Sequence, residues 1–84
     1  MNPNLTATLI TSYEEASTTE TGHIYGYGNI SRYTVGDQEV ETHKTLTGAH
    51  KGEITYALVR PNGYRIISED SPEAQAVQAY EASH

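Results

Sequence analysis

The sequence predicts a small α+β domain: an antiparallel, meander-like β-sheet of about four or five strands, with one C-terminal α-helix packed on one face. Residues 53–68 contain two runs rich in β-branched and aromatic side chains, separated by the turn sequence Pro61-Asn62-Gly63. Helical spacing of apolar residues appears only after residue 69. The chain has 84 residues, so we expect one domain over 1–84, with frayed ends at 1–4 and 83–84.

The first half of the chain predicts two strands joined by a long polar loop. Alternating Leu and Thr side chains begin at Leu5 and predict a strand that runs to about Tyr13. Residues 14–22 are polar and predict a loop or a frayed strand end. A second strand is expected from His23, with a bend or bulge at Asn29 before it continues to Val35.

A two-residue turn is predicted at Gly36-Asp37, where Gly at the first central position favours type II′. This turn places Tyr33 opposite Val40, and Arg32 opposite Glu41 as a cross-strand pair of opposite charge. The returning strand, residues 39–46, should place two sets of side chains on opposite faces: Val40, Thr42 and Lys44 on one, and Glu41, His43 and Thr45 on the other.

Residues 53–60 form the clearest predicted strand, because both of its alternating sides are apolar near the middle. That pattern is typical of a central strand covered on both faces. Pro61 suits the first central position of a type I turn, and Gly63 suits the left-handed position of a G1 bulge. We therefore expect the turn to join two central strands, 53–60 and 64–68.

The predicted helix begins after Ser71, which can cap it, and Pro72 suits the first helical position. Glu73 complements the positive end of the helix dipole. Apolar residues then recur at helical spacing and should face the sheet; they are Ala74, Ala76, Val77 and Tyr80.

The composition narrows the classes of function. The chain has no Cys, which excludes disulfides and thiolate metal sites. It has no run of apolar residues long enough for a membrane span, and its N-terminus lacks the basic and apolar regions of a signal peptide. We therefore expect a cytoplasmic protein without a membrane partner. The core is expected to be thin, because there are seven Tyr but no Phe or Trp.

No pattern of side chains indicates catalysis, a metal or a cofactor. The four histidines (His23, His43, His50 and His84) lack metal-ligand spacing, and no nucleophile elbow is present. We therefore expect a protein that is not an enzyme.

The net charge is −6, and the acidity belongs to the two ends of the chain. Residues 1–31 and 69–84 contain acids but no Lys or Arg, whereas all five basic residues lie between. If the two ends meet in the fold, they form one acidic face. Such a face is either a solvated surface that keeps the protein soluble or a docking surface for a basic partner.

The most distinctive string is Tyr25-Gly26-Tyr27-Gly28, which on a strand places both Tyr on one face and both Gly on the other. Paired tyrosines could stack nucleic-acid bases. Alternatively, the Tyr rings fill the core and the Gly face allows a close approach of other groups. Five basic residues against eleven acids argue against direct nucleic-acid binding.

In size, acidity, lack of Cys and compact α+β shape, the chain resembles small inhibitory proteins encoded by phages, of which anti-CRISPR proteins are typical. The resemblance implies an inhibitor in the host cytoplasm that occludes a nucleic-acid-handling complex, sterically or as a nucleic-acid mimic. The candidate contacts with a basic protein or nucleoprotein partner are Glu14, Glu15, Glu20, Tyr25, Tyr27, Glu69, Asp70 and Glu73.

Two alternatives belong to other classes. One is a structural or accessory module, or a homodimer, that pairs through an open sheet edge. The other is a single-strand nucleic-acid-binding sheet that uses Tyr25 and Tyr27.

Overall fold

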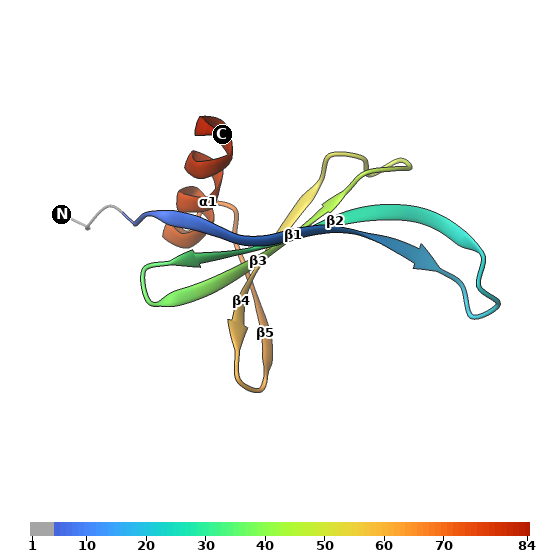
Figure 1. Cartoon of the computed structure of the whole chain (residues 1–84), viewed down its shortest axis with the longest axis horizontal. Helices are drawn as coiled ribbons and strands as arrows, with labels where there is room; N and C mark the ends of the chain where they lie inside the picture. The colour runs from blue at the N-terminus through green and yellow to red at the C-terminus, as the bar shows by residue number, and fades with distance from the viewer. Residues whose placement is uncertain (1–4) are drawn as a thin grey trace.

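Five strands and one helix follow one another along the chain (Figure 1). The structure is a computed structural model that describes residues 5–84, except for the side chain of Tyr25. The fraying expected at residues 1–4 lies outside this part. The elements are β1 (Ala7–Thr18), β2 (Ile24–Val35), β3 (Gln38–Thr45), β4 (Ile54–Arg60), β5 (Gly63–Ile67) and α1 (Pro72–Ser83).

The strands form one antiparallel meander in the order β1-β2-β3-β4-β5, with α1 packed on one face, which confirms the predicted fold class. The expectation that Pro61-Asn62-Gly63 joins two central strands is wrong, because β5 is an edge strand. After β5 the chain leaves the sheet to form α1, so no further strand pairs with it. Gly63 has a φ of 140°, which explains why glycine follows Asn62.

The β2–β3 turn has the predicted register. Val35 pairs with Gln38, Tyr33 with Val40, and Arg32 with Glu41. Gly36 has a φ of 61°, and no non-glycine residue in the described part has a positive φ. These angles fit type II′, in which only the first central residue needs a positive φ, and they exclude type I′.

The β1–β2 hairpin is longer than predicted. β1 continues through the segment expected to be a loop and ends at Thr18, and β2 runs without interruption from Ile24. Each strand pairs with the other over this polar stretch, so backbone hydrogen bonds stabilise strands that lack an apolar face. We call the end of this hairpin, from the pair Glu14–Asn29 to its turn, the arm; beyond the last β2–β3 pair, Gly28–Thr45, the arm has only two strands.

No irregularity lies at Asn29, where one was expected. One extra residue, Ile10 of β1, stands between the pairs Leu9–Tyr33 and Thr11–Arg32, and a second register shift lies near the hairpin turn, between Ser17–Gly26 and Thr18–Ile24. The Asn29 side chain fastens the hairpin, because its Nδ2 donates to the Tyr13 carbonyl (3.2 Å) and to Ser12 Oγ (3.1 Å). β2 therefore stays regular where a bend was predicted.

The helix begins as predicted. Ser71 Oγ accepts a hydrogen bond from the Ala74 N–H (3.3 Å) and donates one to the Ser68 carbonyl (2.7 Å), and Pro72 is the first helical residue. These bonds satisfy backbone groups that a helix end leaves free. At the other end, the His84 ring stacks on Tyr80 with centroids 4.0 Å apart.

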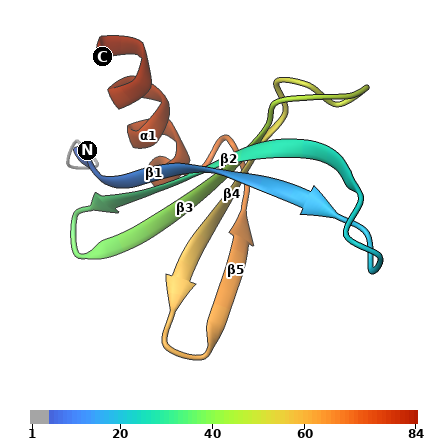
Figure 2. The same ribbon diagram turned by 45° about the vertical axis from the view of Figure 1, so that its right-hand side comes forward.

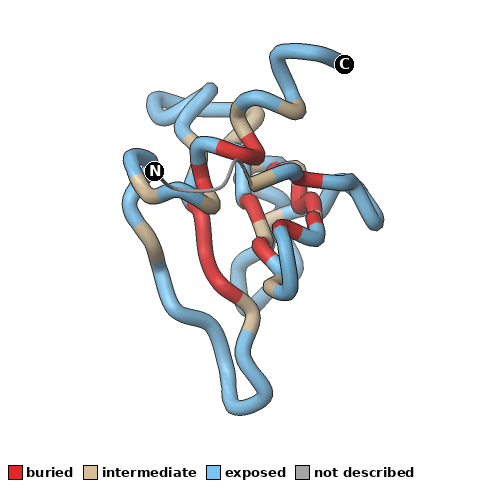
Figure 3. The backbone as a smooth tube through the Cα atoms, turned by 90° about the vertical axis from the view of Figure 1, so that its left-hand side faces the viewer, coloured by how far each residue is buried: buried red, intermediate tan, exposed pale blue. Residues whose placement is uncertain are grey.

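The core lies between α1 and one face of the sheet. Its largest fully buried side chains are Val35, Val40 and Val77, with Ala74 also fully buried. Figure 3 shows buried positions gathered where the sheet and helix meet, and exposed hairpin ends. Tyr33 and Tyr80 contribute the bulk that Phe would otherwise provide; their rings meet edge to face at 5.5 Å.

Only one face of the sheet is covered, so the expectation that β4 is covered on both sides is wrong. Figure 2 shows α1 on one side of the strands. No helix or strand within residues 5–84 lies over the other side. Ala57 of β4 is nevertheless only 8% exposed there, shielded within the sheet where Glu41 and Ile66 are its register partners. Val59 is partly exposed.

We expect Val77→Ala to lower the free energy of unfolding by about 2 kcal/mol, because it removes two buried methyl groups from a small core. Urea unfolding measures this change. The control is Ala79→Ser on the exposed side of the same helix, which should change stability by no more than about 0.5 kcal/mol. Equal effects of the two substitutions would contradict the placement of α1.

Candidate interaction surfaces

The three predicted acids of the first hairpin lie on its arm. Glu14 and Glu15 are adjacent residues of β1 and project to opposite faces, because they pair with the adjacent residues Asn29 and Gly28. Glu20 lies in the turn between β1 and β2. All three are exposed.

The other predicted acids lie at the junction of β5 and α1. Glu69 and Asp70 precede the helix, and Glu73 lies in its first turn. The Glu69 carbonyl accepts hydrogen bonds from the side-chain amides of Gln75 (3.0 Å) and Gln78 (2.9 Å). These bonds fix the backbone of the junction, whereas the Glu69 and Asp70 residues stay exposed.

The two acidic ends do not form one face. In Figure 1 the turn of the β1–β2 hairpin and helix α1 lie at opposite ends of the long axis of the molecule, whose extents are 50 × 30 × 21 Å. The protein therefore has two separate acidic regions, one on the arm and one beside the helix.

Beside the helix, three carboxylates line a groove of about 700 Å³ that we call the acidic groove. They are Glu53 before β4, Glu69 after β5, and Glu81 on α1. Ile54, Tyr56 and Gln78 also line it, and no Lys or Arg is among its lining residues in the described part of the chain. Of these acids the sequence analysis selected only Glu69. Glu81 could have been found, because it lies one helical turn after Val77 and thus near the sheet-facing side.

The carboxylates of the acidic groove affect the hydroxyl groups of two tyrosines in the core, Tyr33 and Tyr56. Tyr33 Oη donates a hydrogen bond to Glu81 Oε1 at 3.2 Å. Burial, with the nearby Glu81 carboxylate, raises the pKa of Tyr33 to about 12. Burial also raises the pKa of Tyr56, helped by the negative charges of Glu81 and Glu69. Both hydroxyls thus remain protonated donors at neutral pH.

In the Tyr25-Gly26-Tyr27-Gly28 string, the two glycines allow other groups to approach the strand closely. A Cβ at Gly28 would lie 2.7 Å from Nε2 of His43, and one at Gly26 would lie 3.0 Å from Oγ1 of Thr47. Thr47 Oγ1 also accepts a hydrogen bond from the Tyr27 N–H at 3.0 Å. Tyr27 is exposed, and the predicted role of the Tyr25 side chain lies outside the described part of the structure.

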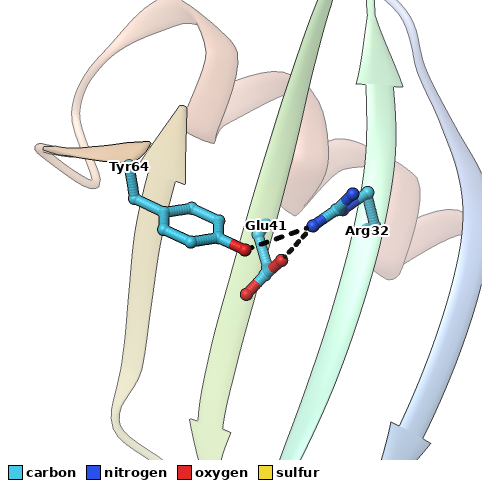
Figure 4. Close-up of polar contacts among 3 residues, drawn as sticks. All are labelled: Arg32, Glu41 and Tyr64. Carbon is cyan, nitrogen blue, oxygen red and sulfur yellow. Dashed lines mark hydrogen bonds and ion pairs between the residues drawn. The ribbon is translucent and has the colours of Figure 1, made fainter. Parts of the chain in front are cut away.

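The side of the sheet that faces away from α1, which we call the open face, carries apolar side chains around one ion pair. Arg32 Nη2 lies 2.6 Å from Glu41 Oε2 and 3.4 Å from the hydroxyl of Tyr64 (Figure 4). The Tyr64 side chain extends from edge strand β5 across β4 toward Glu41 of β3, where the Arg32 side chain reaches it from β2. On the β1 side of the ion pair, Ile10 and Tyr13 line a hollow of about 350 Å³.

The structure provides no constellation for metal chemistry within residues 5–84: no three His, Asp or Glu side chains converge there as metal ligands. His50 and Glu53 form an exposed pair at 2.8 Å between Nδ1 and Oε2. No helix of the described part is both long and apolar enough to cross a bilayer.

Comparisons of the chain with protein-family models, with curated proteins and with solved structures find no match. The charge and shape of the surfaces described above are therefore the basis for a functional proposal.

We expect Tyr33→Phe to lower stability by about 1 kcal/mol at neutral pH, because it removes the hydrogen bond to Glu81. It should also reduce the loss of stability at alkaline pH. In the unfolded chain Tyr33 ionises near pH 10, but in the folded protein its pKa is about 12. Its contribution is therefore intact below pH 10 and is lost as the pH rises from 10 toward 12. Urea unfolding between pH 7 and 12 tests this, with exposed Tyr13→Phe as the control.

We expect Gly28→Ala and His43→Ala to be coupled. The new methyl group must displace the His43 ring, so Gly28→Ala should be less favourable in the parent chain than in the His43→Ala background. The difference should be about 1 kcal/mol in a double-mutant cycle measured by urea unfolding. Additive effects would show that the ring does not hold this position over Gly28.

Proposed function

We propose that this chain is a non-enzymatic binding protein that covers a basic, nucleic-acid-binding surface of a partner protein. The observation that carries the proposal is the acidic groove, where carboxylates from three separate segments converge without a neighbouring Lys or Arg among the lining residues described. Glu53, Glu69 and Glu81 carry the same charge, so a cationic partner would be attracted to all three.

The remaining charges support the same conclusion. Nine of the eleven acids have no ion-pair partner in the described part of the chain; the two that do are Glu41 and Glu53. The arm adds Glu14, Glu15 and Glu20, and the chain has no Lys or Arg before Arg32. Unpaired surface carboxylates speed association with a basic protein and set its orientation.

The strand beside the groove suits an extended basic segment. The β4–β5 ladder ends at the pair Tyr56–Ile67, so the start of β4 extends beyond its neighbour. A partner segment placed along this edge would form backbone hydrogen bonds with β4. Its Arg or Lys side chains would then reach Glu69 and Glu81 across the groove, as charge-assisted hydrogen bonds require.

Protein surfaces rich in Lys and Arg are typically those that bind nucleic acids, because each contact neutralises a phosphate. A protein that covers such a surface inhibits its function. The narrower form of the proposal is an inhibitor of a nucleic-acid-handling host complex, phage-encoded and anti-CRISPR-like, that acts in the host cytoplasm. Occlusion here is steric, electrostatic or both. Of the predicted contacts, Glu69 lines the groove, and Asp70 and Glu73 follow it closely in the chain.

The distribution of charge also favours this proposal over direct nucleic-acid binding through Tyr25 and Tyr27. Base stacking on tyrosines needs cations that hold the phosphates, and the arm contains no Lys or Arg. Repulsion by Glu14 and Glu15 would oppose a nucleic-acid strand along this hairpin.

We expect the triple variant Glu53→Gln, Glu69→Gln, Glu81→Gln to weaken binding of a basic partner by about tenfold or more and to reduce its salt dependence. Glutamine keeps a hydrogen-bond acceptor for Tyr33, so the fold is preserved. Partners are first recovered by affinity capture from host lysate, and the dissociation constant is then measured at several salt concentrations.

The control is Asp37→Asn, Glu39→Gln, which removes two carboxylates that belong neither to the groove nor to the predicted contacts. It should weaken binding much less. The partner should also lose its nucleic acid when the parent chain is added. A captured partner that binds no nucleic acid, or equal weakening by both variants, would contradict the proposal.

A further inference from the structure

The open face is an uncovered apolar surface. Of the five most exposed large hydrophobic side chains that the structure describes, four lie on it: Ile66 (67% exposed), Tyr64 (59%), Ile10 (51%) and Tyr13 (51%). They come from both edges of the sheet, and the Arg32–Glu41 ion pair lies between them. Exposed apolar patches of this kind mark interaction surfaces.

The chain exposes more surface than a compact monomer of its mass. Its accessible surface is 6010 Å², whereas a folded monomer of 9.2 kDa exposes about 4,900 Å². Its radius of gyration is 13.9 Å, against about 12 Å for a compact domain of 84 residues. The excess is about 1,100 Å², which is larger than the roughly 800 Å² per partner of a standard interface.

We propose that the open face is a homodimer interface, in which a second copy of this chain packs its own open face against the first. The interface would be a sheet-on-sheet packing, in which the inward side chains of two sheets interdigitate. This inference does not rest on the proposed function, because it concerns the face opposite the helix and its groove.

The arrangement of the open face suits a two-fold axis. With an axis parallel to the strands, the β1–β2 half of one copy meets the β4–β5 half of the other. Both halves are apolar: Ile10 and Tyr13 lie on the first, and Tyr64 and Ile66 on the second. The dimer therefore contains two equivalent apolar contacts, each between the β1–β2 half of one copy and the β4–β5 half of the other.

Electrostatics distinguish a second copy from a basic partner on this face. Arg32 at its centre is already matched by Glu41 and by the Tyr64 hydroxyl, at 2.6 and 3.4 Å. The exposed Glu39, which lines the hollow beside this pair, has no ion-pair partner among the described residues, so in the dimer it would have to stay in contact with solvent. An internally paired charge tolerates burial far better than an unpaired one. The acidic groove, by contrast, would repel its own copy. Self-association thus fits the open face, and a cationic partner fits the groove.

Sedimentation equilibrium of the full chain over about 5 µM to 1 mM tests the dimer, because its population depends on protomer concentration. We expect a mass that rises toward twice the 9.2 kDa of one chain. Ile66→Lys should raise the dissociation constant of the dimer by about tenfold or more, since the substitution occurs twice. High salt should leave the dimer intact, whereas it weakens docking at the groove.

The matched control is Ile24→Lys, which changes an equally apolar, 55% exposed strand residue on the arm, beyond the last β2–β3 pair. It should leave the dimer unchanged. If Ile66→Lys fails to fold, as judged by circular dichroism, Ile66→Thr keeps the β-propensity while it removes apolar surface. It should weaken the dimer less than tenfold but measurably.

A chain that stays monomeric up to the highest concentration overturns the proposal, as does a dimer that Ile24→Lys and Ile66→Lys weaken equally. Loss of a captured basic partner in Ile66→Lys, with no self-association of the parent chain, would assign the open face to that partner and also overturn the dimer. The groove variants test the proposed function independently of these results.

Discussion

The structure has one short helix to cover its sheet, and the area of that helix limits how much of the sheet is buried. Helix α1 has 12 residues and buries only small side chains, Ala74, Ala76 and Val77, against one face of a five-stranded sheet. These side chains belong to the same buried cluster as Val35 and Val40 of the sheet. With no second helix in the described part, the other face stays uncovered. The hairpin ends also extend past the helix, so the chain exposes more surface than its mass requires.

This constraint separates two surfaces of different chemistry. Around the helix, Glu53, Glu69 and Glu81 form an acidic groove, and the carboxylate of Glu81 helps to raise the pKa of both Tyr33 and Tyr56. On the opposite side, the one strong ion pair is internally matched and apolar side chains dominate. If both proposals hold, a dimer joined through its open faces carries two outward acidic grooves. Such a dimer gains affinity for a repetitive basic target by effective concentration.

The parts of the fold that the sequence predicts are those controlled by a few adjacent residues. Gly36 selects the turn that sets the β2–β3 register, and Ser71 with Pro72 sets the start of the helix. The predictions that fail depend on pairing with another strand. The polar segment after Tyr13 becomes part of β1 because β2 lies alongside it. The bulge lies at Ile10, and Asn29, which looks like a breaker, instead bonds across the hairpin.

The sequence by itself determined the class of fold, the register of the β2–β3 turn and the acidity of both ends of the chain, because propensity, turn chemistry and charge are local properties. Only the tertiary structure decided which acids converge and which face stays open. Tyr33 and Glu81, which are 48 residues apart in the chain, meet only when α1 lies on the sheet. Glu53 and Glu81 have no local signature that joins them. Their convergence follows from the path of the backbone, which packing of the helix fixes.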